Sequence, residues 1–343
     1  MKIYKISGGY KDLIETLLKT GSNIIAPVRK NNLTKFALIS GPDEVISPDE
    51  LLNTVRPAKE HFFPMTEPVA WFSYEGKSLR IGDVDLPDEK NVIVGLRPCD
   101  AAAFDAIDKI FGYVYHDKFY LTRRNNTTVI SVACERPDEA CFCTSFGLSP
   151  DSTKGSDILI KINNDGLFYA FVITEKGQAL AEGINNIVKE EQTDPGRERY
   201  ATAESKIRAP LDLPVIKEAL DNNFESDYWD EFSRCLGCAS CAYLCPTCHC
   251  FDIVDVVKYD KGLRKKNWDA CQFTSFTLHA SGHNPRDAQN KRYRQRLMHK
   301  FKYYHDRFET HLCTGCGRCI RSCPVNIDIY EAAAAFYRSE VNN

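Results

Sequence analysis

The chain has 343 residues, 43% apolar and 27% charged, which is the composition of an ordinary globular protein with room for two or three cores. Its 44 basic and 47 acidic side chains give a formal net charge of −3, which argues against a general nucleic-acid or membrane-surface binder. No signal segment is visible, and no apolar run reaches the roughly 18 residues of a membrane span. We therefore expect the fifteen cysteines to be thiolates in a reducing cytoplasm.

The first half of the chain has the pattern of an α/β domain. Residues 92–96 (VIVGL) predict a buried strand, Asp100 is placed to cap a following helix, and residues 127–133 (TTVISVA) predict a second strand. A strand, helix and strand in succession indicate a right-handed crossover between two parallel neighbours. Further on, two β-rich segments flank Asn163, Asn164, Asp165 and Gly166, which is a strong hairpin signal.

Four cysteines follow the two predicted parallel strands. Cys99 comes just after the first strand and Cys134 just after the second, so both are expected at the same edge of the sheet, where open α/β sheets place their ligands. Cys141 and Cys143 are close enough in sequence to fold back onto that edge. Two interpretations remain open. The four thiols either bind a third iron-sulfur cluster or fill a small core as free cysteines.

The most specific pattern is a cysteine run that occurs twice near the C-terminal end. Each copy has the form C-x2-C-x2-C-x3-C-P, which holds a [4Fe-4S] cluster in bacterial two-cluster ferredoxins. Zinc ribbons use separated pairs of cysteines instead. The first run is Cys235, Cys238, Cys241 and Cys245, and the second is Cys313, Cys316, Cys319 and Cys323.

The fourth cysteine of such a run, just before proline, ordinarily binds the other cluster. The runs therefore predict crossed ligation, in which each cluster takes three cysteines from one run and the last from the other. One cluster then uses Cys235, Cys238, Cys241 and Cys323, and the other uses Cys313, Cys316, Cys319 and Cys245. Because each cluster ties the two runs together, cluster assembly and folding of this module should be one event.

The sequence between and before the runs sets the domain organisation. Residues 286–308 contain no Pro or Gly and predict a helix, which favours a helical ferredoxin-like module. We expect an overall α+β fold with an α/β domain over residues 1–190 that holds the possible third cluster, a charged linker with connecting helices over 191–234, and the two-cluster module over 235–343.

Several reactive side chains remain outside these groups. Cys248, Cys250 and Cys271 have no fourth partner, so packing near the first run is the favoured interpretation, while lining that pocket or hydrogen bonding to its sulfurs stays open. No metal-binding spacing unites His249, His279 and His283, which are interpreted as structural.

Strings around the cysteines resemble one known family. RPCD, CERPDEACFC, CLGCASCAYLCPTCHC, WDACQFTSF, SGHN and CTGCGRCIRSCP are similar to those of the iron-sulfur beta subunits of cytoplasmic sulfhydrogenases and the A subunit of anaerobic sulfite reductase. The likeness extends from about residue 92 to 325. It implies a subunit that carries electrons between a flavin subunit, which meets a nicotinamide or ferredoxin, and a catalytic subunit. It also favours the third cluster and implies that WDACQ and SGHN surround the clusters.

An electron-relay subunit of a cytoplasmic hydrogenase or sulfur/sulfite reductase complex is therefore the leading hypothesis, without catalytic residues of its own. No glycine-rich nucleotide cradle is visible, so flavin and NAD(P) belong to partners. One alternative is a self-sufficient reductase that uses the N-terminal site. Another is an iron-sulfur nucleic-acid protein, suggested by the basic residues 286–307, although the net charge favours a solvated helix face or a positive flank beside the clusters.

Overall fold

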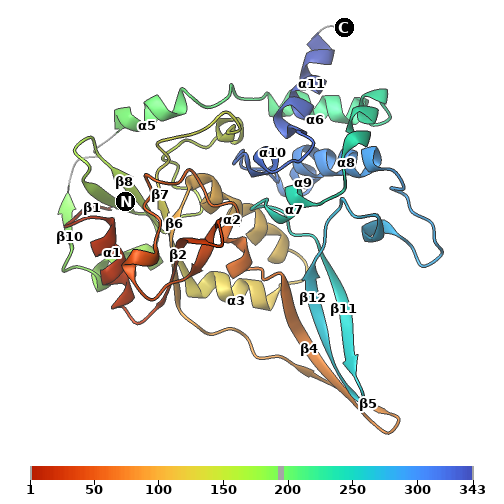
Figure 1. The fold of residues 1–343 in the computed structure, drawn as a ribbon, viewed down its shortest axis with the longest axis horizontal. Coiled ribbons are helices and arrows are strands. Elements are labelled where there is room, and N and C mark those ends of the chain that lie inside the picture. The colour runs from red at the N-terminus through yellow and green to blue at the C-terminus, as the bar shows by residue number, and fades with distance from the viewer. Residues whose placement is uncertain (1, 192–196, 342–343) are drawn as a thin grey trace.

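The computed structural model describes residues 2–191 and 197–341, and within them the chain forms two β-sheets surrounded by helices (Figure 1). The larger sheet has the strand order β10-β1-β9-β8-β7-β6-β2-β3. Its strands are β1 (Lys2–Ile6), β2 (Asn23–Lys30), β3 (Leu33–Leu38), β6 (Asn91–Leu96), β7 (Thr127–Val132), β8 (Ile158–Ile162), β9 (Phe168–Val172) and β10 (Val188–Glu191).

The centre of this sheet is parallel, as the sequence predicts. β6 pairs in parallel with β7 on one side and with β2 on the other, and β7 pairs in parallel with β8. β8 and β9 form the expected antiparallel hairpin. The helix after β6 begins at Pro98, with Arg97 at the N-cap position, so the prediction that Asp100 caps it is wrong. Pro at the first helical position needs no backbone donor, and Asp100 in the first turn is free to bind elsewhere.

Helices cover both faces of the sheet and fill the C-terminal region. Their bounds are α1 (Tyr10–Leu18), α2 (Pro98–Phe111), α3 (Lys118–Asn126), α4 (Glu175–Gly183), α5 (Arg197–Glu204), α6 (Leu213–Asn222), α7 (Ser240–Tyr243), α8 (Gln289–Met298), α9 (Tyr304–Phe308), α10 (Arg318–Arg321) and α11 (Ile329–Val341). Segments of 3₁₀ helix occupy Pro42–Glu44, Ala58–His61, Cys143–Phe146, Asp227–Arg234 and Thr274–Thr277. No described helix is both long and apolar enough to cross a lipid bilayer.

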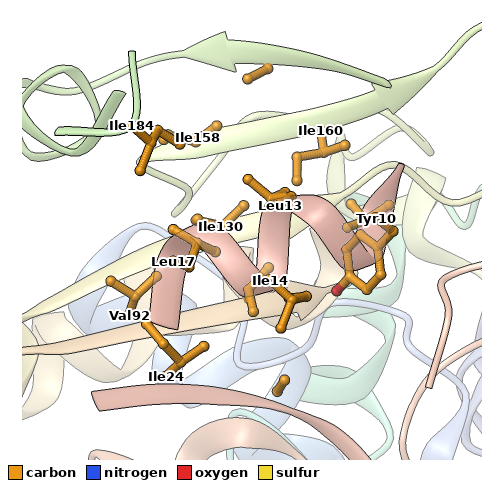
Figure 2. Packing of buried hydrophobic residues seen from close by; sticks show 14 of the residues in the cluster. Tyr10, Leu13, Ile14, Leu17, Ile24, Val92, Ile130, Ile158, Ile160 and Ile184 are labelled. Atoms are coloured by element: carbon orange, nitrogen blue, oxygen red, sulfur yellow. The ribbon is translucent and has the colours of Figure 1, made fainter. Parts of the chain in front are cut away.

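One core lies between α1 and the larger sheet. Leu13, Ile14 and Leu17 occur at helical spacing and are almost fully buried. Figure 2 shows these side chains pointing at isoleucines and valines of the central strands, among them Ile130 and Ile160. Burial of a side chain of this size stabilises the fold by about 1.5–3 kcal/mol. This core fixes the strands whose carboxyl ends carry Cys99 and Cys134.

The smaller sheet joins the two halves of the chain. It has the order β11-β12-β4-β5 and projects from the body as an arm (Figure 1). β12 (Lys261–Trp268) pairs with β11 (Phe251–Lys258) and also with β4 (Thr66–Glu75), while β5 (Ser78–Asp83) lies at the other edge. The predictions from sequence contain no strands between the two cysteine runs, so this hairpin is a correction to the expected all-helical insert.

Residues 286–308 are mainly helical, as expected. α8 continues through a π-helical turn, His299–Tyr303, into α9. Arg292, Arg296 and Lys300 recur every four residues along this helix, and all three are buried. The basic segment is therefore not simply a solvated helix face. The buried stripe faces the cysteine region, which agrees with the alternative of a positive flank beside it.

Candidate metal centres

The first cysteine run and the last cysteine of the second run line one cavity, which we call the first cavity. Cys235, Cys238 and Cys241 surround it, and Cys323 reaches it from the other run. This is the set of four that crossed ligation predicts. Cys238 is exposed, so the first cavity lies at the protein surface.

Local backbone geometry shapes this loop. Gly237 and Ala239 both have positive φ, at 66° and 60°, so the chain winds tightly between successive cysteines. Ala239 precedes the short helix α7, which carries Cys241. Gln289 at the start of α8 donates a side-chain hydrogen bond to the Cys235 sulfur at 3.4 Å, and such bonds to ligand sulfurs tune a cluster.

The second run surrounds Cys245 of the first. Cys245 acts electrostatically on Cys313, Cys316 and Cys319, in each case raising the thiol pKa, so it lies near all three cysteines of the second run. The Lys300 ammonium donates to the Cys245 sulfur at 3.3 Å. The structure thus gathers the first predicted set around one cavity and places Cys245 near the second run.

The four N-terminal cysteines also meet. Cys99, Cys134, Cys141 and Cys143 line a single cavity, the N-terminal cavity, at the carboxyl ends of β6 and β7. The convergence arises because parallel strands end at one edge of a sheet. Cys316 of the second run lines the same cavity.

Contact between the N-terminal cavity and the second run is close. Phe142 donates its backbone N–H to the carbonyl of Gly315 at 2.9 Å. Gly315 has a φ of +62°, and a Cβ there would lie 2.4 Å from the backbone nitrogen of Cys143. Only glycine fits such an approach, so the two cysteine loops are packed backbone to backbone.

The chemistry of these sites suits iron-sulfur clusters. Burial raises the pKa of Cys141, Cys143, Cys241 and Cys313 to about 12, so the thiols stay protonated unless a metal displaces the proton. In the described part of the chain no three Cys, His, Asp or Glu side chains are placed to bind a single metal ion. Thiolates standing around a cage, rather than around one ion, fit a cubane.

Buried positive charge supports the same conclusion. The side chains of Arg296 and Lys300 are 2% exposed, and within residues 2–191 and 197–341 neither forms an ion pair with a carboxylate. Burial lowers the pKa of Lys300, but the neighbouring Cys245 and Cys248 more than offset this, so its pKa is raised. Burying a cation without a counter-charge costs free energy. Anionic clusters beside Arg296 and Lys300 would supply that counter-charge.

Sequence reasoning did not single out these buried cations or the supporting amides. Arg296 donates to the Cys241 carbonyl at 2.8 Å, and Lys59 in the N-terminal half donates to the Cys248 carbonyl at 2.9 Å. Gln272 lines the first cavity. The four-residue spacing of the basic side chains in α8 was the available signal, whereas nothing local marks Lys59.

The remaining cysteines and histidines lie in two places. Cys248 lies beside Cys245 and forms no separate site of its own in the described cavities, and Cys250 lies beside Cys271. His249 is partly buried beside them, and desolvation lowers its pKa to about 4. His279 and His283 form a ring contact on an exposed loop, with centroids 5.4 Å apart.

Residues 234–327 match the family model of the 4Fe-4S dicluster domain. Over 96% of its length the chain is 29% identical to sulfhydrogenase 2 subunit beta from Pyrococcus furiosus, of which it covers 96%. The resemblance expected from the cysteine strings is therefore confirmed. A chain of the F420-reducing [NiFe] hydrogenase complex from Methanosarcina barkeri matches with a TM-score of 0.34 and 9% identity, covering 66% of this chain and 94% of that one.

Proposed function

We propose that the chain is an iron-sulfur relay subunit of a cytoplasmic oxidoreductase complex. It passes single electrons between a flavin subunit, linked to NAD(P) or ferredoxin, and a catalytic subunit of the hydrogenase or sulfur/sulfite reductase type. The similarity to a sulfhydrogenase beta subunit and the dicluster domain support this assignment. The two crossed sets of cysteines hold two clusters, and the N-terminal set holds a third.

The placement of the second run is the observation that carries this proposal. Its loop, residues 313–323, lies between the other two sites, because Cys316 lines the N-terminal cavity and Cys319 lines the first cavity. Three redox centres that are connected by one loop form a path for electron transfer rather than three isolated centres. Cys238 at one end is exposed and Cys134 at the other is partly exposed, which supports docking of a partner at each end.

The chain itself supplies the holding and tuning of the centres. When bound, a cubane cluster accepts and releases one electron at a time, at a potential set by nearby charge, hydrogen bonds and exposure. The Gly315 backbone N–H donates to the Cys313 sulfur at 3.4 Å, the Ile327 backbone N–H donates to the Cys323 sulfur at 3.2 Å, and Lys300 places a positive charge at Cys245. Each of these contacts favours the reduced, more negative form.

The first test compares the isolated chain with its native complex. Purified without oxygen, the isolated chain should be reduced by dithionite yet remain inert toward NADH, hydrogen and sulfite. Activity should return only when a flavin subunit and a terminal subunit, recovered by native co-purification, are added back. Turnover of any of the three by the pure chain would favour the self-sufficient reductase instead.

A second test interrupts the middle of the path. Cys313 belongs to the second run but lines neither neighbouring cavity, so Cys313→Ala should damage the central centre and spare the other two. In the complex, the end centres should still be reduced from their own sides while overall turnover falls to a small remainder. His279→Ala on the exposed loop serves as the control. Full turnover by the Cys313→Ala complex would exclude a relay through this loop.

A further inference from the structure

Two glutamine side chains lie between helix α8 and the first cysteine run. Gln289, at the start of α8, donates to the Cys235 sulfur at 3.4 Å and to the side-chain oxygen of Gln272 at 2.9 Å. An amide NH2 group has two hydrogens, so both are used. A Cβ at Gly237 would lie 3.2 Å from the side-chain oxygen of Gln289, which places this amide against the cysteine loop.

Arg292 sets the orientation of the Gln289 amide. Its guanidinium Nε donates to the side-chain oxygen of Gln289 at 2.9 Å, and one of its terminal nitrogens donates to the Arg286 carbonyl at 2.6 Å. A guanidinium has donors only and keeps its charge at any ordinary pH. The amide oxygen must therefore face Arg292, which leaves the NH2 group to face the Cys235 sulfur.

Gln272 holds the other side of the same network. This side chain is 1% exposed, and its NH2 group donates to the backbone carbonyl of Arg292 at 3.1 Å. Its oxygen is therefore the end that accepts from Gln289. Turning either amide over would bring a donor against a donor in a buried place, which costs free energy. Both amides are thus fixed, and Gln289 presents a hydrogen to the Cys235 sulfur.

Arg292 also brings a positive charge into this network. It is 7% exposed, and across residues 2–191 and 197–341 no carboxylate forms an ion pair with it. Hydrogen bonds in a chain polarise one another, so the charge on Arg292 strengthens the bond that Gln289 donates to the sulfur. A stronger bond to a ligand sulfur favours negative charge on a cluster, and a cluster gains negative charge when it is reduced.

We propose that Arg292 is a positioning residue that raises the reduction potential of a cluster in the first cavity by acting through Gln289. The inference rests on the proposed function in one respect, since it requires a cluster in that cavity, and it is independent of the partner subunits. The arrangement differs from that at Cys245, where the Lys300 ammonium donates to the sulfur directly.

Potentiometric titration followed by EPR is the direct test, on the full chain prepared without oxygen. The signal of the first cavity is the one that Cys323→Ala removes. In Arg292→Met the equilibrium constant for reduction of this cluster should fall about tenfold, which is a potential about 59 mV more negative for one electron. The signals of the other clusters should keep their potentials. An unchanged potential, or an equal shift in every cluster, would overturn the proposal.

Arg294→Met is the matched control for the charge that is removed. Arg294 lies on the same helix, and its guanidinium donates to the Phe224 carbonyl and to Glu225. The variant loses the same charge and should keep the wild-type potential of the first-cavity cluster. A shift as large as that of Arg292→Met would show an effect of overall charge and would contradict the assignment.

A double-mutant cycle tests the route through Gln289. Gln289→Leu alone should lower the potential, because the Cys235 sulfur loses its hydrogen bond. If Arg292 acts through that amide, adding Arg292→Met to Gln289→Leu should change the potential little further. Additive shifts would show that Arg292 acts directly by its charge. Where Arg292→Met does not fold, Arg292→Lys, which lacks the planar fork, completes the same cycle.

Iron content separates this inference from the proposed function. The Arg292 and Gln289 variants should keep the wild-type iron content, because no cysteine is changed. Loss of the first-cavity iron in Gln289→Leu would mean that the amide builds the site, and tuning by Arg292 would be excluded. A wild-type chain without a cluster in the first cavity would remove both proposals, whereas a cluster whose potential does not move would remove only this one.

Discussion

The Asp100 carboxylate and the Arg318 guanidinium form a buried, two-bond ion pair between the halves of the chain. Both side chains are 2% exposed, and one of the two hydrogen bonds measures 2.8 Å. Asp100 follows Cys99 of the N-terminal site, and Arg318 precedes Cys319 of the second run. Arg318 also donates to the Thr54 carbonyl at 2.7 Å. The pair therefore fixes the position of one cysteine site relative to the other.

Breaking this pair from one side should be costly. Asp100→Asn leaves the buried Arg318 without its counter-charge, which is expected to destabilise the chain by about 3–5 kcal/mol. Replacing both residues together, as Asp100→Asn with Arg318→Met, removes the isolated charge and should recover much of the loss. Unfolding in denaturant without oxygen measures the loss of stability in the single variant and its recovery in the double variant, each relative to the wild type. Equal stability of the single variant and the wild type would contradict the buried pair.

Crossed ligation predicts damage at a distance in sequence. Cys323→Ala should impair the cluster whose other ligands are Cys235, Cys238 and Cys241, because Cys323 lines the first cavity. Cys245→Ala is the reciprocal variant and should impair the cluster of the second run. EPR of the reduced variants distinguishes the two signals. If Cys323→Ala affected only the cluster of Cys313, Cys316 and Cys319, ligation would run within each run instead.

The N-terminal cavity predicts a separate loss of iron. Cys141→Ser should lower the iron content by about four atoms per chain, the content of one cubane. Thr144→Ala is a matched control, since Thr144 lies in the same loop but does not line the cavity. Iron determination on anaerobically purified protein measures the change. An equal iron content in Cys141→Ser and in the wild type would favour the free-cysteine interpretation.

A partly buried histidine, His299, predicts a loss of stability in acid. Burial lowers the pKa of His299 from its ordinary 6.5 to about 3 in the folded chain. The unfolded chain therefore binds the proton first, and the stability this residue gives is complete above pH 6.5 and is lost as the pH falls toward 3. At pH 5 the loss is on the order of 2 kcal/mol.

His299→Gln removes this titration, so its unfolding midpoint should fall less steeply than that of the wild type between pH 6.5 and 5. Lys11→Gln, which changes an exposed side chain far from the cavities, should keep the wild-type slope. Anaerobic thermal unfolding at several pH values gives the comparison. Parallel pH profiles of the His299→Gln variant and the wild type would show that His299 is not held neutral by burial.

Features that short stretches of sequence determine could be predicted from the sequence alone. The cysteine runs are local, and the proline after each fourth cysteine suggested that Cys323 would reach the first cavity, which it does. The convergence of Cys99 and Cys134 followed from two strands whose apolar pattern was plain. In each case the physical signal lay within about ten residues of the side chains concerned.

Features that depend on distant partners could not be predicted. β11 and β12 carry many charged residues and have no clean alternation, because β12 is completed by β4 from the other half of the chain. Lys59 reads as an ordinary surface cation, and its burial makes sense only once the cysteine sulfurs are placed beside it. Its charge compensation comes from distant parts of the fold and leaves no mark in the local sequence, whereas the spacing of Arg292 and Arg296 was a local signal.

The shared small sheet sets the order in which a newly made chain can be completed. At ordinary rates of synthesis, β4 emerges on the order of ten seconds or more before β12. Until then its edge is unpaired, and the nascent chain carries apolar side chains such as Trp71 and Ile81, which stay partly exposed even in the finished fold. Protein that stalls before residue 261 would present this open edge to its neighbours. The first half of the chain therefore depends on its last third for a complete small sheet, and the exposed edge is an aggregation hazard until β12 has been made.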